Sequence, residues 1–268
     1  MASTPGELLE IAVRIAREAA ATARRMRAEG ITDLQTKSTD TDVVTAADKA
    51  VERQVVEALR RERPGDSVLG EEYGDSATPE PGAVRWILDP IDGTVNYLYG
   101  LPQYAVSLAA EVDGVVLAGV VRNAATGDEW TATRGGGAWR DGQRLSGSVR
   151  TALEQSLVGT GFGYDAARRE HQGRVVAGLI TQVRDIRRFG AAAIDLCLVA
   201  EGSLDAYFEK GLNPWDHAAG GLIAQEAGLR VAGIDGAPAG PLMVIAAPPA
   251  IFGALHDALA KLDAAGGA

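Results

Sequence analysis

Four stretches of the chain place acidic side chains beside apolar or glycine-rich sequence, where a strand or helix is expected to begin or end. In WILDPIDGTVNY, residues 86–97, Asp89 and Asp92 follow an apolar run that predicts a buried strand. The other stretches contribute Glu71 and Glu72 in VLGEEYG, Asp42 and Asp48 in TDVVTAAD, and Asp216 in NPWDHAAGG. If the fold brings these carboxylates together, their mutual repulsion requires cations between them. Carboxylates, a backbone carbonyl and water suit magnesium, and the lack of His or Cys at these positions disfavours zinc.

Each acidic residue also has an explanation that needs no ligand. Asp42 and Asp216 could cap helices, and Asp89-Pro90 could form a turn. Glu71-Glu72 could be a solvated pair. Their joint occurrence, rather than any single residue, favours a metal site.

Hydrophobic periodicity predicts the elements that position the first of these residues. Apolar side chains near the N-terminus recur with a period close to 3.6 and stop at Gly30, which predicts an amphipathic helix. A second helix is expected from Ala46, with Pro64-Gly65 ending it. Residues 67–145 form short β-type runs separated by turn dipeptides such as Asp113-Gly114, and therefore predict an antiparallel meander.

After about residue 150, short strands alternate with helical stretches. Helices are expected at residues 166–183, 191–202, 216–228 and 249–262. We therefore expect two lobes: an α+β lobe at residues 1–145 and an α/β lobe at residues 146–268.

Length and charge exclude several classes of protein. The 268 residues carry a net charge of −10 at pH 7, and no Lys/Arg-rich run interleaved with aromatics appears, so nucleic acid is not an expected partner. The most apolar stretch, GPLMVIAAPPAIFGAL, is too short and too proline-rich to cross a bilayer, and no signal-peptide core is present. We expect a cytoplasmic protein without a membrane partner. Cys197, the only cysteine, lies in an apolar run and is expected in the core.

The motifs DVVTAAD, GEE, WILDPIDGTVNY and WDHAAGG, in this order, resemble those of the inositol monophosphatase family of magnesium-dependent, lithium-sensitive phosphatases. The resemblance covers nearly the whole chain. Within the family, RRFGAAAIDLCLVAEGSLDAYFEKGLNPWDHAAG resembles the bacterial inositol-1-phosphatase branch. The resemblance implies an α+β fold, a layered α-β-α-β-α sandwich of the inositol monophosphatase and fructose-1,6-bisphosphatase type, and a homodimer.

The resemblance also implies roles for individual residues. The implied metal ligands are Glu71, Asp89, the Ile91 carbonyl, Asp92 and Asp216. Glu71 and the Thr94 hydroxyl are expected to orient the attacking water, with Asp48 polarising Thr94. The implied substrate-binding residues are Ile91, Asp92, Gly93, Thr94, Gly190, Ala191, Ala192, Glu209 and Asp216. Among these, Gly93 and Thr94 are expected to contact the phosphate and Glu209 the hydroxyls of the substrate.

The chemistry explains why carboxylates would serve a phosphatase. A phosphate monoester is a dianion that an acidic protein repels, so the carboxylates must first collect Mg²⁺ ions that reverse the local charge. The expected reaction is hydrolysis of inositol-1-phosphate to inositol and phosphate, by in-line attack of a metal-activated water. The expected partner is therefore a small phosphorylated polyol.

Several alternatives remain open. Histidinol-phosphate, fructose-1,6-bisphosphate and nucleotide 3′-phosphatases share the metal site, although Val95 stands where the resemblance would place an arginine in the histidinol enzyme. A non-catalytic regulatory homologue is a fourth alternative, but it has no need to retain all the acidic residues. Ala191 stands where the family often has a hydroxyl residue, so that side-chain contact with a polyol is lost. Glu209 could instead be a solvated strand end, and Lys37 could be an ordinary loop lysine or could help hold the metal-binding loop.

Overall fold

The computed structural model describes residues 3–31, 35–36 and 43–267, so Lys37 and Asp42 lie outside the described residues. The helices are α1 Pro5–Glu29, α2 Ala46–Glu62, α3 Thr94–Tyr99, α4 Ala166–Leu179, α5 Ala192–Glu201, α6 Pro214–Glu226 and α7 Pro249–Lys261, with a short 3-10 helix at Leu153–Gln155. The strands before residue 145 are β1 Gln35–Thr36, β2 Val43–Val44, β3 Ser67–Gly70, β4 Gly74–Asp75, β5 Val84–Asp92, β6 Ala105–Val112, β7 Val115–Asn123, β8 Glu129–Thr133, β9 Gly137–Arg140 and β10 Gln143–Arg144. Those after it are β11 Leu157–Thr160, β12 Asp185–Arg187, β13 Ala206–Glu209, β14 Arg230–Ala232 and β15 Val244–Ala247.

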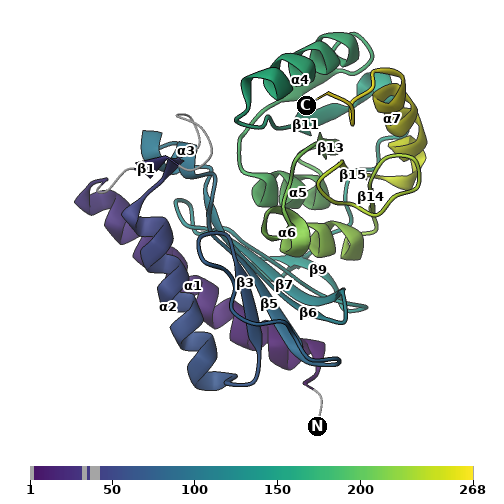
Figure 1. Ribbon diagram of the computed structural model, residues 1–268. Helices are drawn as coiled ribbons and strands as arrows, with labels where there is room; N and C mark the ends of the chain where they lie inside the picture. The colour runs from purple at the N-terminus through teal and green to yellow at the C-terminus, as the bar shows by residue number, and fades with distance from the viewer. Residues whose placement is uncertain (1–2, 32–34, 37–42, 268) are drawn as a thin grey trace.

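Helices and sheets alternate in five layers (Figure 1). Helices α1 and α2 cover one face of an eight-stranded sheet, and α5 and α6 lie between this sheet and a five-stranded one. Helices α4 and α7 cover the outer face of the five-stranded sheet. The predicted α-β-α-β-α sandwich is therefore confirmed. The eight strands come from residues 67–144 and the five from residues 157–247, while a domain boundary near residue 145 stays a prediction.

The first two helices form as their sequences predict. Thr4 caps α1 and Thr45 caps α2, each in a reciprocal capping box with an acidic residue three positions later. The apolar stripe of α1 is buried against the sheet: Leu8, Ala12, Ile15, Ala19 and Ala23. The helix ends before Gly30, and α2 ends before Pro64.

The eight-stranded sheet has the order β10-β9-β8-β7-β6-β5-β3-β4 and is not wholly antiparallel. Asp113 and Gly114 both have positive φ and form the predicted turn between β6 and β7. In contrast, β3 pairs in parallel with β5. The chain leaves β3 through a hairpin to the edge strand β4 and returns on the other side of β3, so the antiparallel prediction is wrong for this pair.

The five-stranded sheet is mixed, in the order β12-β11-β13-β15-β14. All four helices expected after residue 150 are present within a few residues of their expected bounds. Helix α5 is buried on nearly all sides, and Cys197 in it is fully buried, as predicted. None of the helices in the described part of the chain combines the length and the apolar composition needed to cross a membrane.

Candidate active site

Asp89 and Asp92 lie at the end of β5, where the strand carries a β-bulge. On a regular strand, side chains alternate between the two faces, so residues three apart would point in opposite directions. Here Asp89 pairs with Ser107 and Asp92 pairs with Ala105, which are two positions apart on β6. The extra residue in β5 therefore places both carboxylates on the sheet face that packs against α5 and α6. Pro90 in the strand interior is the sequence signal for this bulge, because it has no N–H to donate to the ladder.

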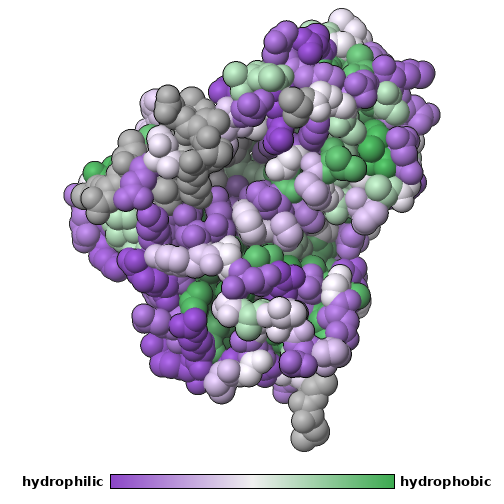
Figure 2. Space-filling view, in the orientation of Figure 1, coloured by the Kyte–Doolittle hydropathy of each residue, from purple (hydrophilic) through white to green (hydrophobic). Residues whose placement is uncertain are grey.

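Both carboxylates line a cavity of about 660 Å³ between β5 and the C-terminal helices, in the region where Figure 2 shows the surface hollowed. The predicted site residues on its wall are Glu71, Asp89, Ile91, Asp92, Gly93, Thr94, Gly190, Ala192, Glu209 and Asp216. Asp48 is buried behind Thr94. Ala191 is not on this wall: it precedes α5 in an extended conformation and its side chain is buried in the core, so its expected contact with substrate stays a prediction.

Burial and mutual repulsion raise the pKa values of the carboxyl groups. Burial raises the pKa of Asp89 well above its ordinary value, and the charge of Glu71 raises it further, followed by those of Asp92 and Asp216. Burial raises the pKa of Asp92 to about 7, although a hydrogen bond from the Ala193 N–H opposes the shift. The pKa of Asp216 is also raised well above its ordinary value, chiefly by burial. A cation among these groups would stabilise their charged forms, because it would offset both the loss of hydration on burial and the repulsion between the carboxylates.

The Thr94 hydroxyl lies between Asp48 and the bulge. Thr94 Oγ1 is 3.1 Å from Asp48 Oδ1 and 3.1 Å from the Ile91 carbonyl oxygen, and can donate its proton to either. Asp48 Oδ2 in turn accepts the N–H of Thr45 at 2.8 Å and its hydroxyl at 2.5 Å. The capping box of α2 thus fixes Asp48 in the orientation that a polarising partner of Thr94 needs.

The other two carboxylates come from element ends. Glu71 lies in the three-residue loop of the β3–β4 hairpin, where Gly70 pairs with Gly74. Asp216 lies in the first turn of α6, and its Oδ2 accepts the Asn213 N–H at 2.6 Å in a capping box. The N-cap of α6 is therefore Asn213 rather than Asp216, but the Asp216 carboxyl group takes part in the cap and also lines the cavity.

Glu209 is the last residue of β13 and lines the same cavity. Its Oε2 accepts a hydrogen bond from the Tyr207 hydroxyl. Gly161 leaves the space for this carboxylate, because a Cβ there would lie 1.9 Å from Glu209 Oε2. Burial raises the pKa of Glu209 to about 7, against the lowering effects of the Tyr207 hydrogen bond and the Arg188 charge.

Two long-range hydrogen bonds join the end of β5 and helix α3 to the C-terminal elements. Asp92 Oδ2 accepts the Ala193 N–H at the start of α5, at 2.8 Å. Asn96 Nδ2 donates to the Phe189 carbonyl at 2.7 Å and to the Gln103 carbonyl at 2.8 Å. Neither bond could be predicted from the sequence, because Asp92 and Ala193, like Asn96 and Phe189, lie on segments that are far apart in the chain. Such pairs leave no local pattern.

The wall also carries side chains that the sequence analysis did not select: Phe162, Tyr164, Arg168, Arg188 and Trp215. Most of them come from loops, where periodicity gives no signal. The guanidinium carbon of Arg188 lies 5.8 Å from the centre of the Phe162 ring. Two arginines thus bring positive charge to the wall of an acidic cavity.

The donor set fits a hard divalent cation. Among the groups that line the cavity, the four carboxylates expected as metal ligands and the Ile91 carbonyl all offer oxygen, which Mg²⁺ prefers. Within the described residues, no three His, Cys, Asp or Glu side chains are already gathered so that they could hold a metal ion. Because like charges repel, we expect the carboxylates to draw together only around a cation.

Comparisons with known proteins agree on one family. The sequence profile described as the inositol monophosphatase family matches residues 5–263. The protein named inositol-1-monophosphatase SuhB of Mycobacterium tuberculosis is 44% identical over 277 aligned residues, which cover 97% of this chain and 95% of that protein. The protein named Nus factor SuhB of Salmonella typhimurium is 38% identical over 223 residues, covering 82% and 83%. The solved structure of Mycobacterium tuberculosis SuhB superposes with a TM-score of 0.83 at 41% identity, covering 98% of this chain and 100% of that one.

Proposed function

Because the chain belongs to the inositol monophosphatase family, we propose that it is a magnesium-dependent phosphomonoesterase that hydrolyses inositol-1-phosphate to inositol and phosphate. The observation that carries this proposal is the convergence of four carboxylates, Glu71, Asp89, Asp92 and Asp216, on one cavity beside Thr94. A homodimer is part of the proposal through the resemblance alone.

The residues that would hold Mg²⁺ are Glu71, Asp89, the Ile91 carbonyl, Asp92 and Asp216. When bound, Mg²⁺ supplies the positive charge that attracts a phosphate dianion and makes an attacking water more acidic. The carboxylates alone would repel the substrate, so their first task is to gather the metal.

Thr94 and Glu71 would hold the attacking water. If the Thr94 hydroxyl donates its proton to Asp48, the lone pairs of Oγ1 are available to accept a hydrogen bond from water in the cavity. Glu71 lines the same cavity and would accept the second proton of this water. Asp48 acts through Thr94, because it is buried and does not reach the cavity.

The substrate would lie between the bulge and the C-terminal wall. Gly93 has a φ of +87°, and a Cβ there would lie 2.7 Å from the Gln103 carbonyl oxygen, so only glycine fits and the backbone N–H groups can approach a phosphate. Gly190, which lies next to Gly93, and Ala192 would offer backbone atoms to the ring, and Glu209 would accept hydrogen bonds from ring hydroxyls.

A panel of phosphate esters tests the substrate. With Mg²⁺ present, kcat/KM for inositol-1-phosphate is expected to exceed the values for histidinol phosphate, fructose-1,6-bisphosphate and a nucleoside 3′-phosphate. A higher value for any of these three would reassign the substrate while leaving the metal-dependent chemistry in place.

Glu209→Gln is expected to weaken turnover of inositol-1-phosphate selectively. A charge-assisted hydrogen bond contributes about 1.5 to 3 kcal/mol, so the loss should be on the order of tenfold or more. The measurement is the ratio of kcat/KM for inositol-1-phosphate to kcat/KM for a simple phosphate ester without ring hydroxyls, which cancels general damage to the site. Glu170→Gln, the same change on the exposed face of α4, is the control. An unchanged ratio in Glu209→Gln would mean that Glu209 does not contact the polyol.

Lithium is expected to inhibit the enzyme at concentrations at which sodium has no effect. The resemblance places a weakly held Mg²⁺ beside Asp92 and Asp216, and a small monovalent cation could replace it. Initial rates in matched lithium and sodium chloride series measure the difference, and equal responses to the two salts would count against this metal arrangement.

A regulatory role without turnover is the second candidate, because the relative named Nus factor SuhB is 38% identical to this chain. Substitution of Asp89 separates the two functions. It should abolish phosphate release, which depends on the metal-binding carboxylates, and should leave a regulatory role without turnover intact.

A further inference from the structure

The hairpin loop that carries Glu71 is held from behind by a carboxylate on α2. Glu52 is fully buried, and both of its oxygens accept backbone N–H groups of this loop. Glu52 Oε2 accepts the Glu72 N–H at 2.9 Å, and Oε1 accepts the Tyr73 N–H at 3.1 Å. The two donors are the main-chain groups directly after Glu71, so the carboxylate fixes the turn on which Glu71 stands.

The strand before the loop is shaped to admit this carboxylate. Gly70 is the last residue of β3, and a Cβ there would lie 2.0 Å from Glu52 Oε1 and 2.4 Å from its carboxyl carbon. Gly70 has no positive φ, so backbone conformation does not require glycine at this position. The absence of a side chain is instead required by the close approach of Glu52.

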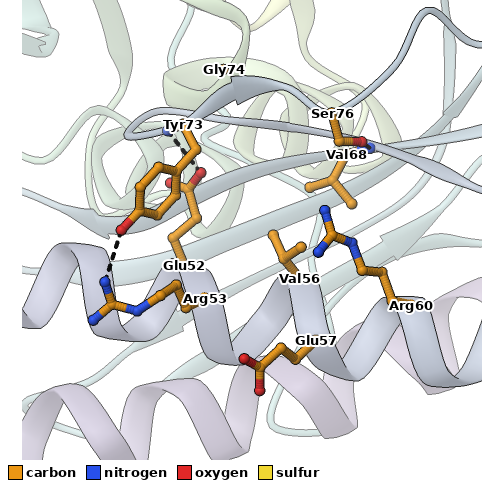
Figure 3. A pocket seen from close by; sticks show the side chains of 9 residues that line it. All are labelled: Glu52, Arg53, Val56, Glu57, Arg60, Val68, Tyr73, Gly74 and Ser76. Atoms are coloured by element: carbon orange, nitrogen blue, oxygen red, sulfur yellow. Dashed lines mark hydrogen bonds between the residues drawn. The ribbon is translucent and has the colours of Figure 1, made fainter.

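The next residue of α2 holds the outer end of the same loop. Arg53 Nη1 donates to the Tyr73 hydroxyl at 2.9 Å (Figure 3). Figure 3 shows Glu52 and Tyr73 beside a second cavity of about 410 Å³, which α2 and the hairpin line together. The loop thus separates two cavities: Glu71 lines the acidic one, and Glu52 lines the other.

We propose that Glu52 is a positioning residue, which sets the affinity of the acidic cavity for Mg²⁺ by fixing the loop that carries Glu71. Glu52 contacts neither substrate nor metal. Its two hydrogen bonds reduce the number of conformations available to the loop before metal binds, so less conformational entropy is lost when Glu71 closes on the ion. This inference rests on the proposed function where its test measures phosphate release. Its tests by Mg²⁺ binding and amide exchange rest only on the hydrogen bonds between Glu52 and the loop.

Glu52→Gln tests the proposal with almost no change of shape. The amide oxygen can still accept one N–H, but the NH₂ group would face the other donor, so one of the two hydrogen bonds is replaced by repulsion. We expect the Mg²⁺ concentration for half-maximal phosphate release to rise on the order of tenfold or more. The same shift is expected in the dissociation constant measured by calorimetric titration of Mg²⁺ without substrate. If Glu52 had only a structural role, Glu52→Gln would lower the melting temperature but would leave the half-maximal Mg²⁺ concentration and the dissociation constant of Mg²⁺ unchanged.

Glu57→Gln is the matched control, because Glu57 lies on the same helix and lines the same second cavity but does not hold the loop. It should leave the Mg²⁺ dependence of wild type unchanged. Equal Mg²⁺ affinity in Glu52→Gln and Glu57→Gln would overturn the proposal. If the wild type releases no phosphate at all, the proposed function fails, and the calorimetric titration still decides the role of Glu52.

Hydrogen exchange in the wild type keeps the proposal testable if Glu52→Gln does not fold. In metal-free protein, the amides of Glu72 and Tyr73 are expected to exchange on the order of a hundredfold or more slowly than in an unstructured peptide, because both are bound to Glu52. Exchange of these two amides at the peptide rate would show that the loop is not held, and would overturn the proposal.

Discussion

Asp89→Asn is expected to lower phosphate release at least on the order of a thousandfold. The substitution removes the charge of a proposed metal ligand with little change of shape. Metal ions contribute several kcal/mol to charge stabilisation in the transition state, and about 1.4 kcal/mol corresponds to a tenfold change in rate. The fold should be retained, because asparagine can still accept the Ile91 N–H that Asp89 Oδ1 accepts at 3.0 Å.

The melting temperature separates loss of metal from loss of fold. Without metal, Asp89→Asn should melt at or above the wild-type temperature, because it removes one charge from a buried cluster that repels itself. Added Mg²⁺ should stabilise the wild type and not the variant, since a ligand stabilises only the state that binds it. Asp113→Asn, the same change in the β6–β7 turn, should behave as wild type. Wild-type activity in Asp89→Asn would remove Asp89 from the site.

Thr94→Val is expected to lower kcat by roughly 10²- to 10⁴-fold, the usual contribution of a group that positions a proton transfer. Valine keeps the branched shape and removes only the hydroxyl that lies 3.1 Å from Asp48 Oδ1. The Mg²⁺ affinity should stay close to that of wild type, because the Thr94 side chain is not a proposed ligand. This separates Thr94→Val from Asp89→Asn, which should lose both properties.

Two further variants control this result. Thr94→Ser retains a hydroxyl and should keep most of the activity, whereas Thr131→Val makes the same change as Thr94→Val on β8 and should have no effect. If Thr94→Val turns over at the wild-type rate, the attacking water is oriented by other groups.

The parts of the fold that the sequence predicts are those with local causes. The α1 stripe ends at Gly30, and Asp113-Gly114 adopts the positive φ values that its hairpin needs. The parallel pairing of β3 with β5 could not be predicted in this way, because it depends on which side of β3 the returning chain takes. Strands β12 and β14 have three residues each, too few for an alternating pattern to be recognised.

In the site too, the features with a local sequence signal could be predicted and the long-range contacts could not. Motif resemblance selected the acidic residues, and all those proposed as metal ligands lie on one cavity wall. The bulge had a local signal in Pro90, for which a turn with Asp89 was the only local explanation considered from the sequence. Contacts such as Asn96 with Phe189, or Glu52 with the Tyr73 N–H, join segments whose proximity only the assembled fold creates.

The most direct test of the central claim is phosphate release from inositol-1-phosphate by the purified protein as Mg²⁺ is titrated. Release is expected to be absent when a chelator removes divalent cations, to rise with added Mg²⁺, and to return after the chelator is saturated, because the carboxylates must hold metal before they can bind a phosphate dianion. Release that proceeds equally with the chelator present, or that fails at every Mg²⁺ concentration, would contradict the account.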